Sequence, residues 1–550
     1  MGRMYGKPVS PAPETSTIRR SGAALLVVVA VMLGASTANA IASTAAATSP
    51  ASMHAAPSQP RVLLIGDSIL DQEGSAAAFL LRQSGVDAKS MGVWESGLLT
   101  RDQYDHGKTK LAGFWFHKAK NAIATFDPDV VGVYMNHNYW PPYPRDAAGR
   151  TITNLRSASA QRMIAQQARA LITILRARHA KVFFVAPIPA GSIKNPNPSA
   201  WNPIWHGYLP VLRAMHVSIA DSAKPLERPD GLRAETKPSC SGAPERIRLP
   251  DHDVHLTRFG AALAGSALAG YAANLVHANL NGNAAPGDTA AALVPTTDEH
   301  GYWLIGCDGS VFHFGDASHL PGVRAAIAGH HGVVAAVATP TGAGLWLVAS
   351  DGTIASVGDA PPLTFTASPT VPITDAVGVP GQDGLWATTG SGVVLHAGTA
   401  GAHGGLAGVH LDAKITGISA THDGQGYWLT GGKGKVVAFG TALPYGSVAP
   451  PEQLTGSIVG ITAAPDDHGY WLVGTDGGVF SFGDARFHGT AIWKRPANRP
   501  DVATPGPANG IVATRGPAQG YWIFGTTGRV SALGAAVAYG GDNNLAIATQ

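Results

Sequence analysis

The chain has 550 residues, of which 45% are apolar and only 14% are charged, and its formal net charge at pH 7 is +3. A disordered tail or a coiled coil of this length would carry far more charge, so most of the chain is expected to bury a hydrophobic core. No long basic run occurs beyond the N-terminus, and nucleic acid is therefore not expected as a partner. Two cysteines, Cys240 and Cys307, exclude a disulfide-rich scaffold and a cysteine-rich zinc site, and leave one bridge open.

The first 40 residues have the features of a secretory signal peptide. Arg19 and Arg20 precede the apolar run GAALLVVVAVMLG at residues 22–34, and Ala38-Asn39-Ala40 offers a small-residue cleavage site. The apolar run is short for a bilayer span, which needs about 20 residues. We therefore expect cleavage and a secreted or cell-surface protein without a membrane span, with an uncleaved anchor as the alternative. Residues 41–60 are expected to be a flexible linker.

Strand-like and helix-like segments alternate between residues 61 and 280. The predicted strands are RVLLI at 61–65, DVVGVYM at 129–135 and KVFFVAPIP at 181–189, and the predicted helices cover residues 74–84, 155–179 and 257–278. Such alternation predicts a parallel sheet covered by helices.

After a loop-like linker at residues 281–290, a GYWL-type motif recurs six times in residues 291–550. Its tryptophans are Trp303, Trp346, Trp386, Trp428, Trp471 and Trp522, so the period is 40 to 51 residues. Each unit contains strand-like runs joined by glycine turns, such as Asp308-Gly309, which favour hairpins. A period of this length marks a repeat architecture. We predict an all-β domain that forms a six-bladed or seven-bladed β-propeller, with a β-solenoid as the alternative.

The repeated aromatic and acidic residues each have two interpretations. The tryptophans are expected to pack between units rather than to stack on sugars. Asp316, Asp359 and Asp484 are expected to be turn residues, with calcium binding as the alternative. The repeats resemble GYWLVASDGG-type repeats found behind secreted actinobacterial enzymes, a resemblance that implies no particular activity.

Candidate catalytic residues stand near both ends of residues 61–280. Ser68, in Ile65-Gly66-Asp67-Ser68, directly follows the first predicted strand, at the edge where open α/β sheets bind ligands. A helix that starts there would favour developing negative charge. Asp251, Asp253 and His255 precede the last predicted helix, and a serine, a histidine and an aspartate are what a serine nucleophile requires. The alternatives are a helix N-cap for Ser68 and an exposed loop position for His255.

With these motifs, residues 60–280 resemble the SGNH or GDSL-type hydrolases, an esterase and lipase superfamily with a flavodoxin-like α/β/α fold. The resemblance implies that Ser68 is the nucleophile and His255 the base, and that no cofactor is needed. It also implies an oxyanion hole made by the Ser68 N–H, by Gly97 or alternatively Gly92, and by Asn138.

Two departures from the family pattern leave alternatives open. In the third block, Asn136 and Tyr139 stand where the family has Gly and Asp, so Asn136 is the alternative oxyanion amide. In the last block, His252 stands where the family has Asp, so either Asp251 or Asp253 would orient His255. Asp251 is slightly favoured, because one loop insertion would restore the family spacing. A metal site built from this last block is less favoured, since no second ligand cluster is apparent.

The sequence thus predicts a secreted serine esterase. Its ester substrate would be an acylated polysaccharide, which we favour, or a lipid or small ester, and acyl transfer would use the same groups. Trp205 and Tyr208 lie in a loop-like segment and are expected either to wall the cleft or to pack in the core. The alternative function is a catalytically degenerate scaffold whose repeat domain binds a protein or glycan at the cell surface.

Overall fold

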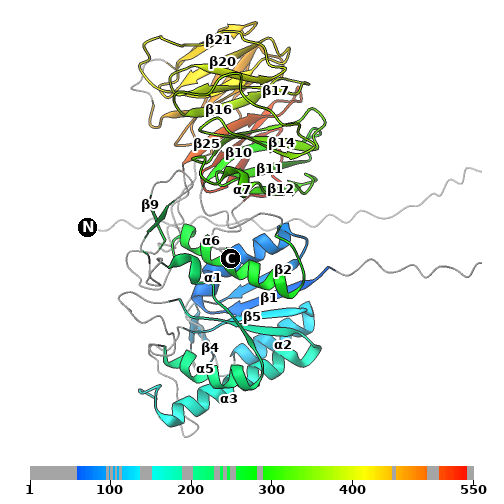
Figure 1. Cartoon of the computed structure of the whole chain (residues 1–550), viewed down its shortest axis with the longest axis vertical. Coiled ribbons are helices and arrows are strands. Elements are labelled where there is room, and N and C mark those ends of the chain that lie inside the picture. Colours follow the sequence, from blue (N-terminus) through cyan, green and yellow to red (C-terminus); the bar gives the residue numbers. More distant parts are fainter. Residues whose placement is uncertain are drawn as a thin grey trace, which may run out of the picture. The chain divides into compact units, whose positions relative to one another are not determined.

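A computed structural model of the protein describes two regions of different architecture (Figure 1). The described residues are 59–93, 98, 103–105, 108–110, 114–136, 152–188, 202–227, 234, 236–238, 244–247, 256–280, 289–448, 454–491 and 507–541. Within these ranges, no helix combines the length and the apolar character that a bilayer span requires.

The first region is built on a five-stranded sheet in the order β2-β1-β5-β6-β7. Its strands are β1 (Arg61–Gly66), β2 (Asp87–Gly92), β5 (Val130–Tyr134), β6 (Lys181–Val185) and β7 (Ser218–Ala220). All neighbouring strands run parallel. The chain passes from β1 to β2 on one side and then returns to β5 on the other, so the connections change direction between β1 and β5. Open α/β sheets bind ligands at such a switch point, outside the carboxyl ends of the strands.

Helices cover both faces of this sheet (Figure 1). They are α1 (Ser68–Gln83), α2 (Phe114–Phe126), α3 (Ala158–Leu175), α5 (Pro203–Ala214) and α6 (Arg258–Leu275). Side chains alternate along β1: Val62 and Leu64 share a core with α1 and α6, whereas Leu63 and Ile65 share one with α2, α3 and α5. Minor elements are the hairpins β3 (Gln103–Asp105) with β4 (Lys108–Lys110) and β8 (Thr236–Pro238) with β9 (Pro244–Arg246), and the short helices η1 (Arg176–Arg178) and η2 (Lys224–Leu226).

The predicted strands and the two later helices are confirmed, but two local interpretations are wrong. The first helix begins at Ser68 and not at residue 74, because the Asp67 side chain caps it directly after β1. Trp205 and Tyr208 do not wall a cleft. Pro203 starts a helix after the N-cap residue Asn202. Both aromatic side chains are buried in the core between the sheet and the helices α2, α3 and α5.

The second region consists of six three-stranded antiparallel sheets. These are β10 (Ala290–Pro295), β11 (Gly301–Gly306), β12 (Val311–Gly315); β13 (Val333–Ala338), β14 (Gly344–Ala349), β15 (Ile354–Gly358); β16 (Ile373–Gly378), β17 (Gly384–Thr389), β18 (Val394–Gly398); β19 (Ile415–Ala420), β20 (Gly426–Gly431), β21 (Val436–Gly440); β22 (Ile458–Ala463), β23 (Gly469–Gly474), β24 (Val479–Gly483); and β25 (Ala508–Ala513), β26 (Gly520–Gly525), β27 (Val530–Gly534). A short helix, α7 (Arg324–Ile327), follows the first sheet. The first strand of each sheet contacts the first strand of the next, and β25 contacts β10.

The six repeated tryptophans lie on the middle strands and are at most 1% exposed. Each indole Nε1 donates to the backbone carbonyl of the residue fifteen positions later, at 2.6–2.8 Å. Burial with a satisfied N–H supports the packing interpretation and excludes sugar stacking on these rings.

Side chains of the first strands also join consecutive sheets. Asp375 accepts from Ile418 N (3.0 Å), Ser419 from Ala463 N (3.0 Å) and Thr462 from Ala513 N (3.1 Å), and Asn509 donates to Ala290 O (2.9 Å). The last of these bonds joins the final sheet to the first one. Polar side chains therefore supply hydrogen bonds between sheets that share no continuous ladder.

Contacts also join α1 to the first repeat. The rings of Phe79 and Phe312 lie 5.2 Å apart. Gln83 Oε1 accepts from His313 N at 3.0 Å, and Gln83 Nε2 donates to His313 O at 3.1 Å. The contact between α1 and β12 thus combines apolar packing with two hydrogen bonds.

One cysteine of the repeat region is cross-linked. Cys307 is disulfide-bonded, and Cys240 is the only other cysteine of the chain. Thr289 Oγ1 also donates to Cys307 Sγ at 2.9 Å.

Candidate active site

Asp67 joins the carboxyl ends of β1 and β5 to the start of α1. Its carboxylate is fully buried, and Oδ1 accepts from Ile69 N at 3.1 Å while Oδ2 accepts from Asn136 N at 3.0 Å. Its own backbone N–H donates to Tyr134 O at 2.9 Å. Ser68 is consequently the first residue of α1 and not its N-cap, so that alternative is wrong. The serine lies at the positive end of the helix dipole and beside the switch point of the sheet.

Two glycines let the first turn of α1 lie against the sheet. A Cβ on Gly92, at the end of β2, would come within 2.3 Å of the backbone N of Asp71. A Cβ on Gly66 would lie 2.2 Å from Tyr134 O. A larger residue at Gly92 would push α1 away from β2, and one at Gly66 would clash with both β5 and α1. Gly92, the alternative oxyanion glycine, thus packs against the first turn of the helix that starts at Ser68.

Asn136 braces the end of β5 against two neighbouring elements. Its side chain is fully buried, and Nδ2 donates to Val185 O at the end of β6 at 2.7 Å. Its backbone carbonyl accepts from Asn202 Nδ2 at 2.8 Å, and Asn202 Oδ1 in turn caps α5. Among the described residues, Asn136 Oδ1 has no hydrogen-bond partner. A buried carbonyl oxygen without a hydrogen bond lowers the free energy of unfolding by on the order of 1–3 kcal/mol.

Gln72, one turn after Ser68, reaches the segment that precedes α6. Its Oε1 accepts from Leu256 N at 3.0 Å, and its Nε2 donates to Leu256 O at 3.4 Å. Leu256 is the residue after His255. The remaining predicted site residues, His255, Asp251, Asp253, Gly97 and Asn138, lie outside the described residues.

Glu73 is a buried acid that the sequence analysis missed. It is fully buried on α1, and Ser222 Oγ donates to its two carboxylate oxygens at 3.0 and 3.2 Å. Burial above all, and then the negative charges of Asp67 and Asp221, raise the pKa of Glu73 to about 8, although the Ser222 hydrogen bond lowers it. At neutral pH this side chain is therefore mostly protonated. Its position within the apolar face of α1 was the available signal.

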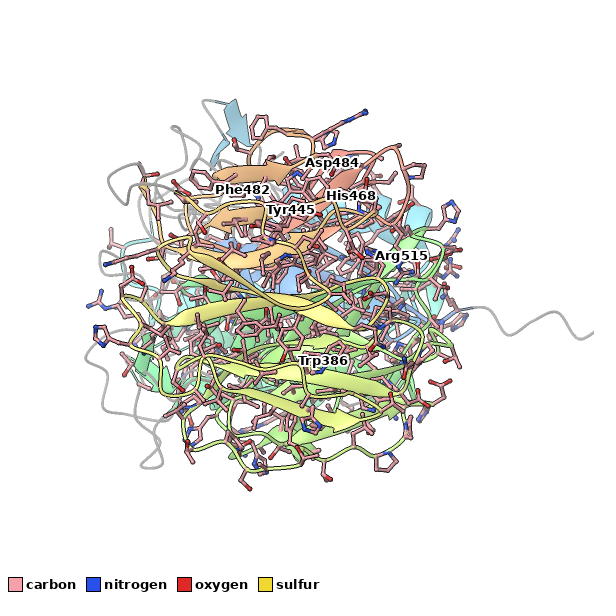
Figure 2. The ribbon with its side chains drawn as sticks, turned by 90° about the horizontal axis from the view of Figure 1, so that it is seen from above. Trp386, Tyr445, His468, Phe482, Asp484 and Arg515 are labelled. Atoms are coloured by element: carbon pink, nitrogen blue, oxygen red, sulfur yellow. The ribbon has the colours of Figure 1, made fainter. Side chains whose placement is uncertain are left out.

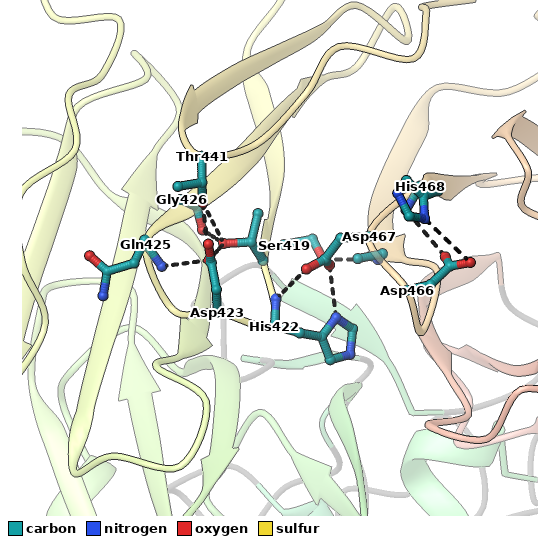
Figure 3. A network of polar contacts seen from close by, with 11 residues as sticks. Ser419, His422, Asp423, Gln425, Gly426, Thr441, Asp466, Asp467 and His468 are labelled. Atoms are coloured by element: carbon teal, nitrogen blue, oxygen red, sulfur yellow. Dashed lines mark hydrogen bonds and ion pairs between the residues drawn. The ribbon is translucent and has the colours of Figure 1, made fainter.

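Polar side chains also cluster in the loops of the repeat region. The backbone N–H and Nδ1 of His422 both contact the Asp467 carboxylate at 2.7 Å (Figure 3). In the neighbouring turn, Asp423 accepts from Thr421 Oγ1 at 2.6 Å and from Thr441 Oγ1 at 3.0 Å. The contact of His422 with Asp467 joins one sheet to the next, whereas the bonds of Asp423 stabilise the turn within its own unit.

The acidic corners fall into two kinds. Asp359 accepts from the hydroxyls of Thr339 and Thr341, as a turn residue does. Asp316 and Asp484 instead belong to exposed groups with a histidine and a second aspartate, Asp298-His300-Asp316 and Asp466-His468-Asp484, whose ligand atoms lie within 4.8 Å of one another. Figure 2 shows His468 and Asp484 close together. Exposed groups of this kind are common without an ion, so their geometry alone does not establish a metal site.

Residues 61–270 match the model of a family described as "Protein of unknown function (DUF459)". A solved structure described as the crystal structure of the lipase/acylhydrolase from Enterococcus faecalis is similar with 12% sequence identity and a TM-score of 0.25, over 40% of this chain and 98% of that chain. No curated protein sequence matches the chain.

Replacing Glu73 by glutamine is expected to change how stability depends on pH. Between about pH 5 and pH 8, folded wild-type protein keeps a proton on Glu73 that the unfolded chain has released, so its stability falls as pH rises. Glu73→Gln retains an acceptor for Ser222 Oγ and does not titrate. The variant should therefore gain stability relative to wild type from pH 5 to pH 8, on the order of a few kcal/mol.

Urea denaturation of the full chain at pH 5, 6.5 and 8 measures this difference. The exposed Asp412→Asn serves as the control and should follow wild type at every pH. A difference between Glu73→Gln and wild type that is the same at all three pH values would contradict the prediction.

Proposed function

We propose that residues 61–280 form an SGNH-type serine hydrolase that cleaves ester-linked acyl groups. The observation that carries the proposal is that α1 is joined at its start to the end of β5 and, one turn later, to the segment before α6. These contacts support a common site for the three separate segments that carry Ser68, Asn138 and His255. The site would lie at the switch point of the parallel sheet, where such folds bind ligands.

In the proposed reaction, Ser68 Oγ attacks the acyl carbon of the ester while His255 accepts the hydroxyl proton. The tetrahedral intermediate expels the alcohol, which takes that proton from His255, and an acyl-enzyme remains. Water then attacks the acyl-enzyme with His255 again as base, and Ser68 leaves with the proton. Asp251 or Asp253 would hold the imidazole in the required tautomer and stabilise its cation. Only these side chains and water are needed.

For the oxyanion hole we propose the Ser68 N–H, the Gly97 N–H and the Asn138 side chain. Asn136 is less suited, because its amide nitrogen already donates to Val185 O and its side chain is fully buried. The start of α1 adds a favourable potential for an oxyanion at Ser68. Each aligned donor is worth about 3–4 kcal/mol of activation free energy.

For the second region we propose a six-bladed β-propeller. Support comes from the cyclic contacts among the first strands and from a cavity of about 940 Å³ that all six of these strands line. The hydrogen bond from Asn509 to Ala290 O, and those from Arg515 to Thr296 O and Thr297 O, join the last sheet to the first. Radial closure of this kind leaves only short, protected sheet edges.

As substrate class we propose acylated polysaccharide outside the cell. The N-terminal segment has the features of a secretory signal, and the hydrolase region is joined to a repeat region that suits a large or surface-bound partner. Acetyl groups on sugar hydroxyls would be attacked by the chemistry described above.

Hydrolysis of p-nitrophenyl acetate and longer acyl esters by the full chain tests the proposed reaction. Ser68→Ala is expected to lower kcat by about 10⁴-fold or more, since the nucleophile is lost. Ser75→Ala, two turns further along α1, is the matched control and should keep the wild-type rate. If wild type and Ser68→Ala share the same negligible rate, on acetylated glycans as well, the serine mechanism is wrong and a binding scaffold is favoured.

The two asparagines are expected to respond differently to truncation. Asn138→Ala should lower kcat about 10²–10³-fold with little change in KM or thermal midpoint, as expected for loss of one oxyanion donor. Asn136→Ala should instead lower the thermal midpoint, because it removes the bond between β5 and β6. Steady-state kinetics and thermal melts of both variants measure this contrast. The reverse pattern would make Asn136 the oxyanion residue.

A further inference from the structure

The side chain of Gln72 forms a two-point contact with one residue of a distant segment. Its Oε1 accepts from Leu256 N and its Nε2 donates to Leu256 O, so both polar ends of the amide are used. The two residues are 184 positions apart in the sequence, and both side chains are buried. Buried polar groups that satisfy each other in this way hold two segments in one relative position.

The residues that follow are held from a second direction. Thr257 N donates to Ile247 O at 3.1 Å, and Thr257 Oγ1 accepts from Gly260 N at the start of α6. A Cβ on Gly260 would lie 2.0 Å from Ile247 O, so α6 begins in close contact with that strand end. Leu256 and Thr257, which follow the predicted base, are therefore held by α1 on one side and by residues 246–247 on the other.

The Leu256 N–H that Gln72 binds belongs to the peptide bond between His255 and Leu256. The same helix carries Ser68 one turn earlier, which is about 6 Å along its axis. A single helix thus carries the serine and binds the residue that follows the predicted base. Misplacement of reacting groups by about 1 Å can lower the rate about 10²-fold. Proton transfer therefore benefits when one helix carries the serine and also binds the residue after the base.

We propose that Gln72 is a positioning residue: it holds Leu256, the residue after the predicted base His255, on the helix that carries Ser68. This role rests on the proposed serine hydrolase function. Gln72 touches neither substrate nor the reacting atoms, and acts only through the Leu256 peptide. It would place the base for proton transfer while leaving substrate binding unchanged.

The test uses Gln72→Met in the full chain. Methionine fills a similar volume but makes neither hydrogen bond, so the hold of α1 on Leu256 is lost. With p-nitrophenyl acetate we expect kcat to fall about 10–100-fold, KM to stay within about twofold, and the pH profile of kcat/KM to shift. A purely structural role would not move the pH profile.

The matched control is Gln161→Met. Gln161 Nε2 also ties a helix to backbone carbonyls, those of Leu155 and Pro203, but it lies on α3 and not on the helix that carries Ser68. This variant should lose thermal stability while keeping the wild-type kcat and pH profile. Should Gln72→Met fail to fold, Gln72→Glu retains the acceptor for Leu256 N and is expected to show a smaller loss of kcat with the same direction of pH shift.

The outcomes separate this role from the function on which it rests. Hydrolysis that depends on Ser68 but is unchanged in kcat and pH profile by both Gln72 variants overturns the positioning role alone. Equal losses of kcat in Gln72→Met and Gln161→Met also overturn it. A wild-type rate equal to that of Ser68→Ala overturns the proposed function, and the positioning role with it.

Discussion

The bridge made by the Asp67 carboxylate is the interaction on which the rest of the first region depends. One oxygen accepts from Ile69 N and starts α1, and the other accepts from Asn136 N at the end of β5. The group is fully buried, so losing either bond would leave a desolvated carboxylate or an unpaired N–H, at a cost of about 1–3 kcal/mol. Because both bonds converge on the residue before Ser68, the same constraint that orders the fold also determines where the candidate nucleophile lies.

Local patterns in the sequence were enough to predict the parallel sheet and the place of Ser68 at its edge. The strands are short apolar runs, and the Gly-Asp-Ser segment follows the first of them directly. The predicted helix began at residue 74 and so left out the first six residues of α1, which include Gln72 and Glu73. Their polar partners lie 184 and 149 positions away, at Leu256 and Ser222, and a local pattern cannot identify partners so distant in the sequence. For the same reason the sequence left Asn136 open as an oxyanion donor, although its amide is used by β6.

In the repeat region the period predicted the number of sheets and the packing of the tryptophans, since every unit repeats both. What holds the units together was not evident from the motif. The bonds between first strands use a different side chain at each junction, such as Asp375 at one and Asn509 at another. Two junctions, β10 with β13 and β13 with β16, are lined mainly by alanine and valine. A repeated motif shows only the residues that all units share, whereas the contacts between neighbouring sheets depend on residues that differ from unit to unit.

Covalent labelling of Ser68 tests most directly whether the residue after Asp67 is an activated nucleophile. The full chain would be treated at pH 7.5 with a fluorophosphonate ester, and the adduct located by peptide mass spectrometry, with urea-unfolded protein as the control. The account predicts one adduct per chain, on Ser68, that forms only in the folded protein and abolishes ester hydrolysis in proportion. Folded protein that hydrolyses esters but is labelled at another serine, or not at all, would contradict it.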